Sequence, residues 1–114
     1  KETTAEWYWL AHFLDGKASF VFGTHTHIQT NDELILPGWT GIISDVWMSG
    51  PLYSVIWAEF ESVKKRFLTW IPKWKIEQHL DMNYVVNGIC VEIWENRKST
   101  QLEKIRVRGK LQKL

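Results

Sequence analysis

The sequence predicts an α/β fold in one domain, or a piece of one, that spans residues 1–114. Two segments have the apolar spacing of amphipathic helices, 4–14 and 58–69. Short apolar runs, closed by glycine or a polar turn, lie in the first half of the chain, as buried strands do in layered α/β proteins. The last third alternates apolar and polar residues, which is typical of antiparallel strands.

A capping box predicts where the first helix begins. Thr3 fits the N-cap position, and Glu6 follows three residues later, where its carboxylate can accept a bond from the backbone N–H of the cap. Asp15-Gly16 predicts the end of this helix. Its expected apolar stripe consists of Leu10, Phe13 and Leu14.

Three short strands are expected in the first half of the chain, at 18–22, 34–36 and 41–44. The first is a continuous apolar run closed by Gly23, a pattern typical of a fully buried strand. Asp45 follows the third strand directly, so it lies at the carboxyl end of that strand. We expect irregular chain over 46–57, because Ser49-Gly50-Pro51 breaks regular structure.

The second helix, 58–69, is amphipathic and is closed by Pro72. Its apolar face consists of Phe60, Val63, Phe67 and Leu68. Acidic residues lie in its first turn and basic residues follow, which is the order that the helix dipole favours. We interpret these charges as a solvated face and not as a binding patch.

The C-terminal third is predicted to be antiparallel, with candidate strands at 74–77, 84–86, 89–93 and 101–107. Asn87-Gly88 is either a two-residue hairpin turn or a kink between two strand segments. Residues 95–99 form an expected turn. The basic tail 106–113 is expected to be a frayed, solvated end.

The composition excludes several classes of protein. With 45% hydrophobic and 24% charged residues the chain is globular, and a net charge of +1 gives no electrostatic reason to expect binding to nucleic acid or to an anionic membrane. Its single cysteine excludes an internal disulfide framework and suits a reducing compartment. No apolar stretch approaches the ~20 residues of a membrane-spanning helix, and the N-terminus lacks a signal-peptide pattern. We therefore expect a cytoplasmic protein.

The segment Gly23-Thr24-His25-Thr26-His27 carries the clearest chemical signal in the chain. In extended backbone, His25 and His27 point to the same side, and neutral imidazole is a common ligand for zinc, iron and similar metals. The segment also follows the carboxyl end of a strand, where α/β sheets place their ligand sites, and Asp45 lies at a neighbouring strand end. The alternative is a pair of surface histidines on a threonine-rich loop.

Other chemistry has little support in the sequence. No glycine-rich phosphate loop precedes a helix. Three serines lack the context of a nucleophile elbow: Ser44, Ser49 and Ser54. Cys90 lies mid-strand and is expected to be buried and inert, while His12 and His79 are expected to be structural or solvated. Two imidazoles alone fall short of the three protein ligands that catalytic metal sites use.

These residues resemble a known family. The strings Asp15–Ser19, Gly23–Glu33 (GTHTHIQTNDE) and Ile35–Gly38 are similar to the C-terminal half of YmdB-type metallophosphoesterases, which belong to the calcineurin-like superfamily of dinuclear-metal phosphoesterases. The similarity continues through Ser44–Val46, Met48–Pro51, Ser54–Ile56, Arg66–Thr69 and Ile71–Pro72, and more loosely over Asn87-Gly88 and the hairpin after it. The long string around the histidines is far more specific than a bare His-x-His.

The resemblance implies a four-layer α/β/β/α sandwich of which this chain is the C-terminal half. It implies hydrolysis of phosphodiesters, with cyclic nucleotides as substrate class and two metal ions, Fe or Mn, as cofactors. His25 and His27 match the last two metal ligands of the family, one for each metal. The other ligands and the general acid would lie upstream, so we expect this chain to begin just after a metal ligand and to be inactive by itself.

The resemblance also suggests a loop on the substrate or metal side that contains Asp45, Met48 and Gly50, while no catalytic residue is assigned in this chain. The metal, the exact substrate and the oligomeric state stay open, and a homo-oligomer is one alternative. A different class of function is also open. The chain could be a small non-enzymatic α+β module in which the histidines bind one structural metal or none.

Tryptophan occupies four positions where the family pattern has glycine, namely Trp39, Trp47, Trp57 and Trp70. Glycine serves where φ is positive or backbones approach closely, and an indole fits such sites poorly. We hypothesise that these codons are UGA, translated here as tryptophan but read as glycine in the source. A genuinely tryptophan-rich relative is the alternative, and the same origin is open for Trp7, Trp9, Trp74 and Trp94.

Overall fold

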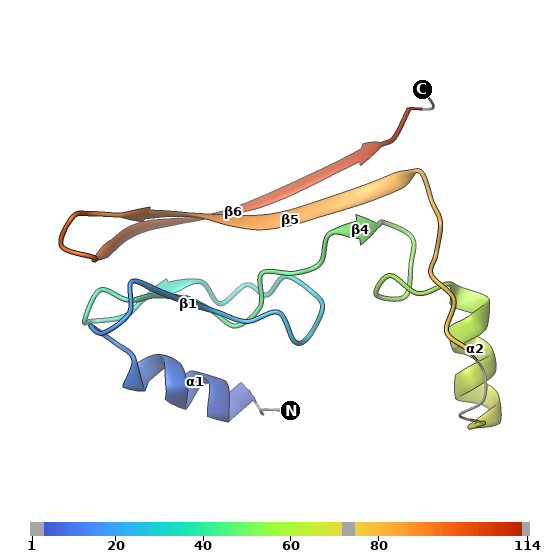
Figure 1. Ribbon diagram of the computed structural model, residues 1–114, viewed down its shortest axis with the longest axis horizontal. Coiled ribbons are helices and arrows are strands. Elements are labelled where there is room, and N and C mark those ends of the chain that lie inside the picture. Colours follow the sequence, from blue (N-terminus) through green and yellow to red (C-terminus); the bar gives the residue numbers. More distant parts are fainter. Residues whose placement is uncertain (1–3, 72–74, 113–114) are drawn as a thin grey trace. The chain divides into compact units, whose positions relative to one another are not determined.

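The computed structural model describes residues 4–71 and 75–112, which form two compact units (Figure 1). The first unit consists of residues up to Met48 together with Asn87–Ile105. The second consists of Ser49–Val86 and the residues from Arg106 onward. The two long C-terminal strands contribute residues to both units.

The first unit contains one helix and a three-stranded sheet, which confirms the predicted α/β class. Its elements are α1 (Thr4–Phe13), β1 (Phe20–Phe22), β2 (Leu34–Ile35) and β3 (Gly41–Ile43). The strand order is β1-β3-β2, with β1 parallel and β2 antiparallel to the central β3. Ile42 pairs with Val21 on one side and with Leu34 on the other. All three strands expected in this half of the chain are therefore present.

The core of this unit joins α1 to the sheet. Its buried residues are Trp7, Ala11, Leu36 and Ile42. The predicted apolar stripe of α1 is wrong in part, since Leu10 is 44% and Phe13 54% exposed. Trp7 and Ala11 are one helical turn apart, so α1 presents this face to the sheet and the residues beside it stay in solvent.

The strands differ in burial according to their place in the sheet. Central β3 is buried along its whole length, as predicted. β1 was expected to be fully buried, but Phe22 is 56% exposed because β1 lies at the edge of this sheet. Gly41 of β3 is closely covered, since a Cβ there would lie 2.9 Å from Leu102 Cδ2 and 3.1 Å from Ser99 Oγ. The C-terminal hairpin thus packs directly on the central strand.

The second unit contains β4 (Gly50–Pro51), which pairs antiparallel with the start of the following strand, and α2 (Phe60–Thr69). The short β4 corrects the expectation of irregular chain over 46–57. Glu59 caps α2, because its carboxylate accepts a 2.8 Å hydrogen bond from the Ser62 N–H. The predicted apolar face of α2 is present in sequence but is not buried within the described chain, where Phe67 is 66% and Leu68 73% exposed.

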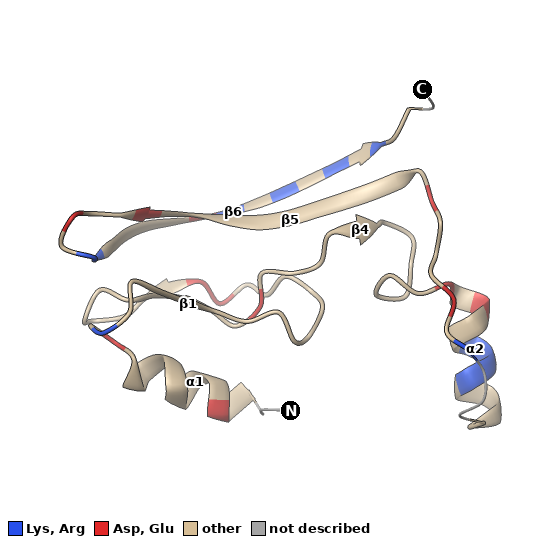
Figure 2. Ribbon diagram, in the orientation of Figure 1, with Lys and Arg blue, Asp and Glu red and all other residues tan. Residues whose placement is uncertain are grey.

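The C-terminal strands are longer than the sequence suggested. β5 (Asn83–Ile93) runs through Asn87-Gly88, which excludes a hairpin turn at that point, and β6 (Ser99–Lys110) returns beside it. The basic residues expected in a frayed tail belong to β6 up to Lys110, where Figure 2 shows them as blue bands. Cys90 is exposed, so the prediction of a buried thiol is wrong. Residues 75–77 form no strand.

Three residues named in the sequence predictions lie outside the described residues, namely Thr3, Pro72 and Trp74. The cap at Thr3 and the part of Pro72 in closing the second helix are therefore left as predictions, whereas α2 ends at Thr69 and the described part of the strand expected at 74–77 is no strand. None of the helices in the described ranges is long and apolar enough to cross a membrane.

Candidate metal centre

The histidine segment is a bent loop that follows β1 and not a continuation of the strand. Residues 25–28 form successive bends, and His27 has a φ of 61°, in the left-handed region. The predicted extended backbone is therefore wrong, and the i, i+2 argument no longer decides where the two imidazoles point. His25 is exposed and His27 partly buried. A left-handed conformation at a non-glycine residue is uncommon and is maintained only where neighbouring groups hold it.

Asp45 holds this loop from beneath. It is fully buried, and its Oδ2 accepts hydrogen bonds from the Thr26 backbone N–H at 2.6 Å, the Thr26 hydroxyl at 2.7 Å and the His27 N–H at 3.2 Å. Its Oδ1 accepts a bond from the Trp47 N–H at 2.8 Å. Both carboxylate oxygens are thus occupied by the loop and by the segment that follows Asp45. Hydrogen bonds to a buried carboxylate are among the stronger ones in proteins.

Backbone contacts fix both ends of the loop to the end of β3. The Gly23 N–H donates to the Ile43 carbonyl at 3.3 Å, and Gly23 in turn accepts from the Val46 N–H at 3.0 Å. The Thr30 N–H donates to the Asp45 carbonyl at 3.0 Å. A Cβ at Gly23 would lie 2.2 Å from the Ser44 carbonyl oxygen, so only glycine fits where the loop begins.

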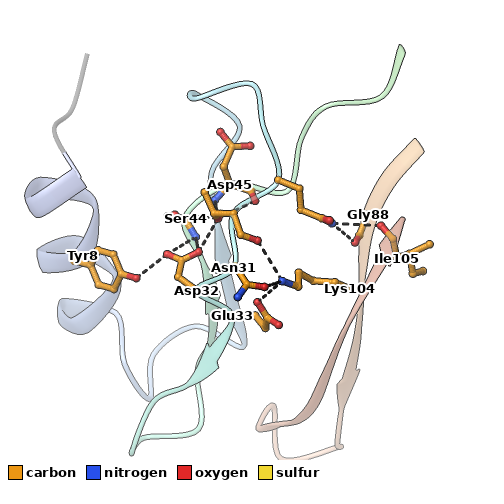
Figure 3. Close-up of polar contacts among 11 residues, drawn as sticks. Tyr8, Asn31, Asp32, Glu33, Ser44, Asp45, Gly88, Lys104 and Ile105 are labelled. Atoms are coloured by element: carbon orange, nitrogen blue, oxygen red, sulfur yellow. Dashed lines mark hydrogen bonds and ion pairs between the residues drawn. The ribbon is translucent and has the colours of Figure 1, made fainter. Parts of the chain in front are cut away.

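A second carboxylate, Asp32, ties the loop to α1 (Figure 3). Its oxygens accept bonds from the Tyr8 hydroxyl at 2.6 Å, the Thr30 hydroxyl at 2.6 Å and the Ser44 N–H at 3.2 Å. Burial raises the pKa of Asp32, but the hydrogen bonds from Thr30, Tyr8 and Ser44 outweigh it and lower the pKa to about 2. The hydrogen bond to Asp32, with burial and the charge of Asp32, raises the pKa of Tyr8 to about 12.

The C-terminal hairpin holds the far side of the loop, as Figure 3 also shows. Gln29 Nε2 donates to the Gly88 carbonyl at 2.9 Å and to the Ile105 carbonyl at 3.3 Å. Lys104 Nζ lies 3.0 Å from a Glu33 carboxylate oxygen and also contacts Asn31 Oδ1. Sequence reasoning assigned no role to Gln29, Asp32 or Lys104. The first two belong to the string that carried the resemblance, whereas Lys104 had no local signal.

The structure gathers His25, His27 and Asp45 at the carboxyl ends of β1 and β3, as the sequence predicted. The indole of Trp47 lies edge-on to the His27 imidazole, with ring centroids 4.5 Å apart. Met48 accepts a bond from the Asn87 side chain through its backbone carbonyl. Gly50 belongs to β4 of the other unit, where it pairs with Val85.

The donor set of this loop suits part of a metal site. Neutral imidazoles bind Fe, Mn and Zn, and two of them occur on one short loop. Across residues 4–71 and 75–112, no cluster of three or more His, Cys, Asp or Glu side chains is arranged to hold a metal ion. Two imidazoles fall short of the three protein ligands that a catalytic metal site needs.

A family model described as YmdB-like protein matches residues 1–105. The chain belongs to the YmdB-like family. A relative from Bacillus subtilis, named 2′,3′-cyclic-nucleotide 2′-phosphodiesterase, is 36% identical over 106 residues. That match covers 91% of this chain and 39% of the relative.

Two solved structures are similar to this one. A hypothetical protein from Thermus thermophilus superposes with a TM-score of 0.85 at 34% identity, over 94% of this chain and 41% of that chain. A protein from Mycoplasma pneumoniae described as a novel phosphatase superposes with a TM-score of 0.83 at 31% identity, over 96% and 39%. These values confirm the α/β fold. The chain spans about two fifths of the length of each of these relatives.

Proposed function

We propose that this chain is part of a metal-dependent phosphodiesterase and supplies His25 and His27 as ligands, one to each of two metal ions. The observation that carries the proposal is the anchored histidine loop at the carboxyl ends of β1 and β3, in a chain of the YmdB-like family. The name of the Bacillus subtilis relative supports a cyclic nucleotide as the substrate. Fe or Mn suits imidazole ligands in such a site.

Two bound metal ions would lower the pKa of a shared water and neutralise charge on the phosphoryl oxygens. The chain's own residues hold the ligands in place. Asp45 and the β3 backbone fix the loop from below, while Asp32 and Gln29 fasten its C-terminal half to α1 and to the hairpin. Such a rigid support favours catalysis, because a ligand displaced by even 1 Å costs much of the rate.

The chain alone is expected to be inactive, because two imidazoles fall short of the three protein ligands of a catalytic site. The remaining ligands would come from outside these 114 residues. A non-enzymatic module with one structural metal or none is the competing function. It predicts no hydrolysis by the complete gene product, whether or not metal binds.

The test is hydrolysis of bis-p-nitrophenyl phosphate and of a 2′,3′-cyclic nucleotide by the complete gene product, with and without Mn²⁺. We expect Mn-dependent turnover that His25→Ala and His27→Ala each reduce by more than the ~10–100-fold typical of losing an outer-shell partner. His12→Ala is the matched control, since His12 is exposed on α1. Metal-independent turnover, full activity in either loop variant, or turnover by residues 1–114 alone would contradict the proposal.

A further inference from the structure

Asp45 occupies a position that suits support of the ligands and not contact with metal or substrate. Its side chain is fully buried. Its four hydrogen bonds use both oxygens on the loop and on Trp47. Three of these bonds go to Oδ2 and one to Oδ1, and the fully buried side chain exposes no surface to a ligand.

Asp45 accepts a hydrogen bond from His27, the histidine whose backbone conformation is unfavourable. His27 has a φ of 61°, a conformation that an L-residue with a side chain rarely adopts. Its N–H points to Asp45 Oδ2 at 3.2 Å, and the preceding Thr26 is held twice by the same oxygen. The carboxylate thus compensates the strain at one of the two histidines.

We infer that Asp45 is a positioning residue, which fixes the backbone of Thr26 and His27 and so sets the placement of the two imidazoles. This inference rests on the proposed metal site. It replaces a direct role for Asp45 in the loop on the substrate or metal side. Outer-shell groups of this kind tune metal affinity because they orient the ligands.

The experiment uses Asp45→Asn in the complete gene product. One carboxylate oxygen becomes an NH₂ group that cannot accept, so at least one backbone donor loses its partner. We expect Mn²⁺ affinity to fall about 10–100-fold, while excess Mn²⁺ restores kcat and KM stays unchanged. Activity loss that excess metal does not restore, or a raised KM, would indicate direct contact and overturn the inference.

Thr26→Val is a milder second variant, because it removes the hydroxyl contacts to Asp45 and to the Ile28 carbonyl and keeps the backbone bond to Asp45. We expect a smaller loss of Mn²⁺ affinity, and no loss in Thr24→Val, which changes an exposed threonine of the same loop. Amide exchange at Thr26 and His27 should speed up in both Asp45→Asn and Thr26→Val, with or without metal. Unchanged exchange would overturn the positioning role even if the wild-type protein binds metal, whereas a wild-type protein without metal affinity would overturn the proposed function.

A second, independent inference concerns three tryptophans with left-handed backbone. Trp39 has a φ of 70°. Its N–H donates to the Leu36 carbonyl, and the Leu36 N–H donates to the Thr40 carbonyl, so the turn between β2 and β3 has three residues. In such a turn, the third residue, here Trp39, has a left-handed backbone and is part of a β-bulge. Glycine is the usual residue at that position.

Trp57 occupies the second position of a different turn. Val55 and Ala58 exchange both backbone hydrogen bonds, and Ile56 and Trp57 between them have φ values of 50° and 71°. Positive φ at both central residues defines a type I′ turn, in which the second central residue is most often glycine. A tryptophan at that position is unusual.

Trp70 ends α2. Its φ of 53° and ψ of 18° are left-handed, and its N–H donates to the Arg66 carbonyl. This is the position after a helix where glycine is strongly preferred, because it alone lacks a Cβ. Its indole is 82% exposed, so no packing compensates the strain.

The geometry points to glycine as the native residue at positions 39, 57 and 70. A UGA codon at each, translated here as tryptophan but read as glycine in the source, would account for this. Three different backbone motifs each place a tryptophan in the left-handed conformation that favours glycine. The inference does not extend to Trp47, whose φ is not positive, nor to Trp7, which is buried in the core on a helix.

The coding DNA tests this inference directly. We expect UGA at positions 39, 57 and 70, and the mass of tryptic peptides from the protein isolated from its source should match glycine at each. UGG codons at these positions, or peptides with the mass of tryptophan, would overturn it. The codon for Trp7 serves as the internal control, for which UGG is expected.

Discussion

Asp45 Oδ2 lies 2.6 Å from the backbone nitrogen of Thr26, the residue between the two histidines of the loop. This short contact connects the end of the central strand to the candidate metal ligands. Because Asp45 is fully buried, the bond is shielded from water and fixes the loop more strongly than a surface contact would. The backbone geometry of the candidate site therefore depends on a buried residue at the end of β3.

Gly23 should not tolerate a side chain. A Cβ would lie 2.2 Å from the Ser44 carbonyl oxygen, so Gly23→Ala forces the start of the loop away from β3. We expect the free energy of unfolding to fall by about 1–3 kcal/mol, as overpacking commonly costs. Gly88→Ala is the matched control, since a Cβ there meets nothing within 4 Å. Urea denaturation of both variants measures the difference, and equal stability would contradict the close approach.

Tyr8 should stabilise the loop through its bond to Asp32. Tyr8→Phe removes a 2.6 Å hydrogen bond to a carboxylate, and we expect a loss of about 1.5–3 kcal/mol in the free energy of unfolding. The exposed Tyr53 gives a matched control as Tyr53→Phe, which should change the stability little. Chemical denaturation followed by circular dichroism measures both.

The depressed pKa of Asp32 makes stability depend on pH in acid. Its pKa is about 2 in the folded chain against an ordinary value of 3.8. The charged form is favoured by folding, so its contribution is fully present above about pH 4 and is lost as the pH falls toward 2. Asp32→Asn should remove this part of the acid dependence. A variant with the same acid profile as the wild type would show that Asp32 is not depressed.

The raised pKa of Tyr8 should make stability depend on pH in base, with the opposite sign to Asp32. Its pKa is raised from 10.0 to about 12, so the protonated form is favoured by folding. The contribution is therefore present below pH 10 and is lost as the pH rises through 12. Ultraviolet titration of tyrosinate should find one tyrosine that ionises near 12 in the wild type and none in Tyr8→Phe.

Replacing three tryptophans by glycine should stabilise the protein. A left-handed residue with a Cβ costs about 1–2 kcal/mol, so Trp39→Gly, Trp57→Gly and Trp70→Gly should each raise stability by up to about 1 kcal/mol after the lost side-chain contacts. The clearest gain is expected at Trp70, which is 82% exposed. Trp9→Gly is the opposing control, because Trp9 lies in α1, where glycine costs about 1 kcal/mol. Thermal melts that show the same sign for all four would contradict the left-handed geometry.

Local patterns in the sequence predicted both helices and the three strands of the first half of the chain, because these segments are strongly periodic or continuously apolar. The continuous apolar run at Gly41–Ile43 became the buried central strand. The helical spacing of Phe67 and Leu68 identified α2, but it could not show whether a partner covers that face. Asn87-Gly88 is locally ambiguous, because pairing with the distant β6 decides between turn and strand.

The histidine pair was found from the sequence, whereas its support was not. His25 and His27 have a recognisable spacing, but the bent backbone at His27 depends on Asp45, 18 residues away. The bonds from Gln29 and Lys104 join parts of the chain more than 50 residues apart, which no local pattern reveals. Sequence reasoning thus identified the candidate ligands, and only the structure showed what holds them.

The most direct test of the metal site is a crystal structure of the complete gene product with Mn²⁺, recorded at the manganese absorption edge. We predict two anomalous peaks at the end of β1 and β3, one within about 2.0–2.3 Å of a His25 nitrogen and the other at the same distance from His27. A structure without an anomalous peak at either histidine, or with both imidazoles on one ion, would contradict the account.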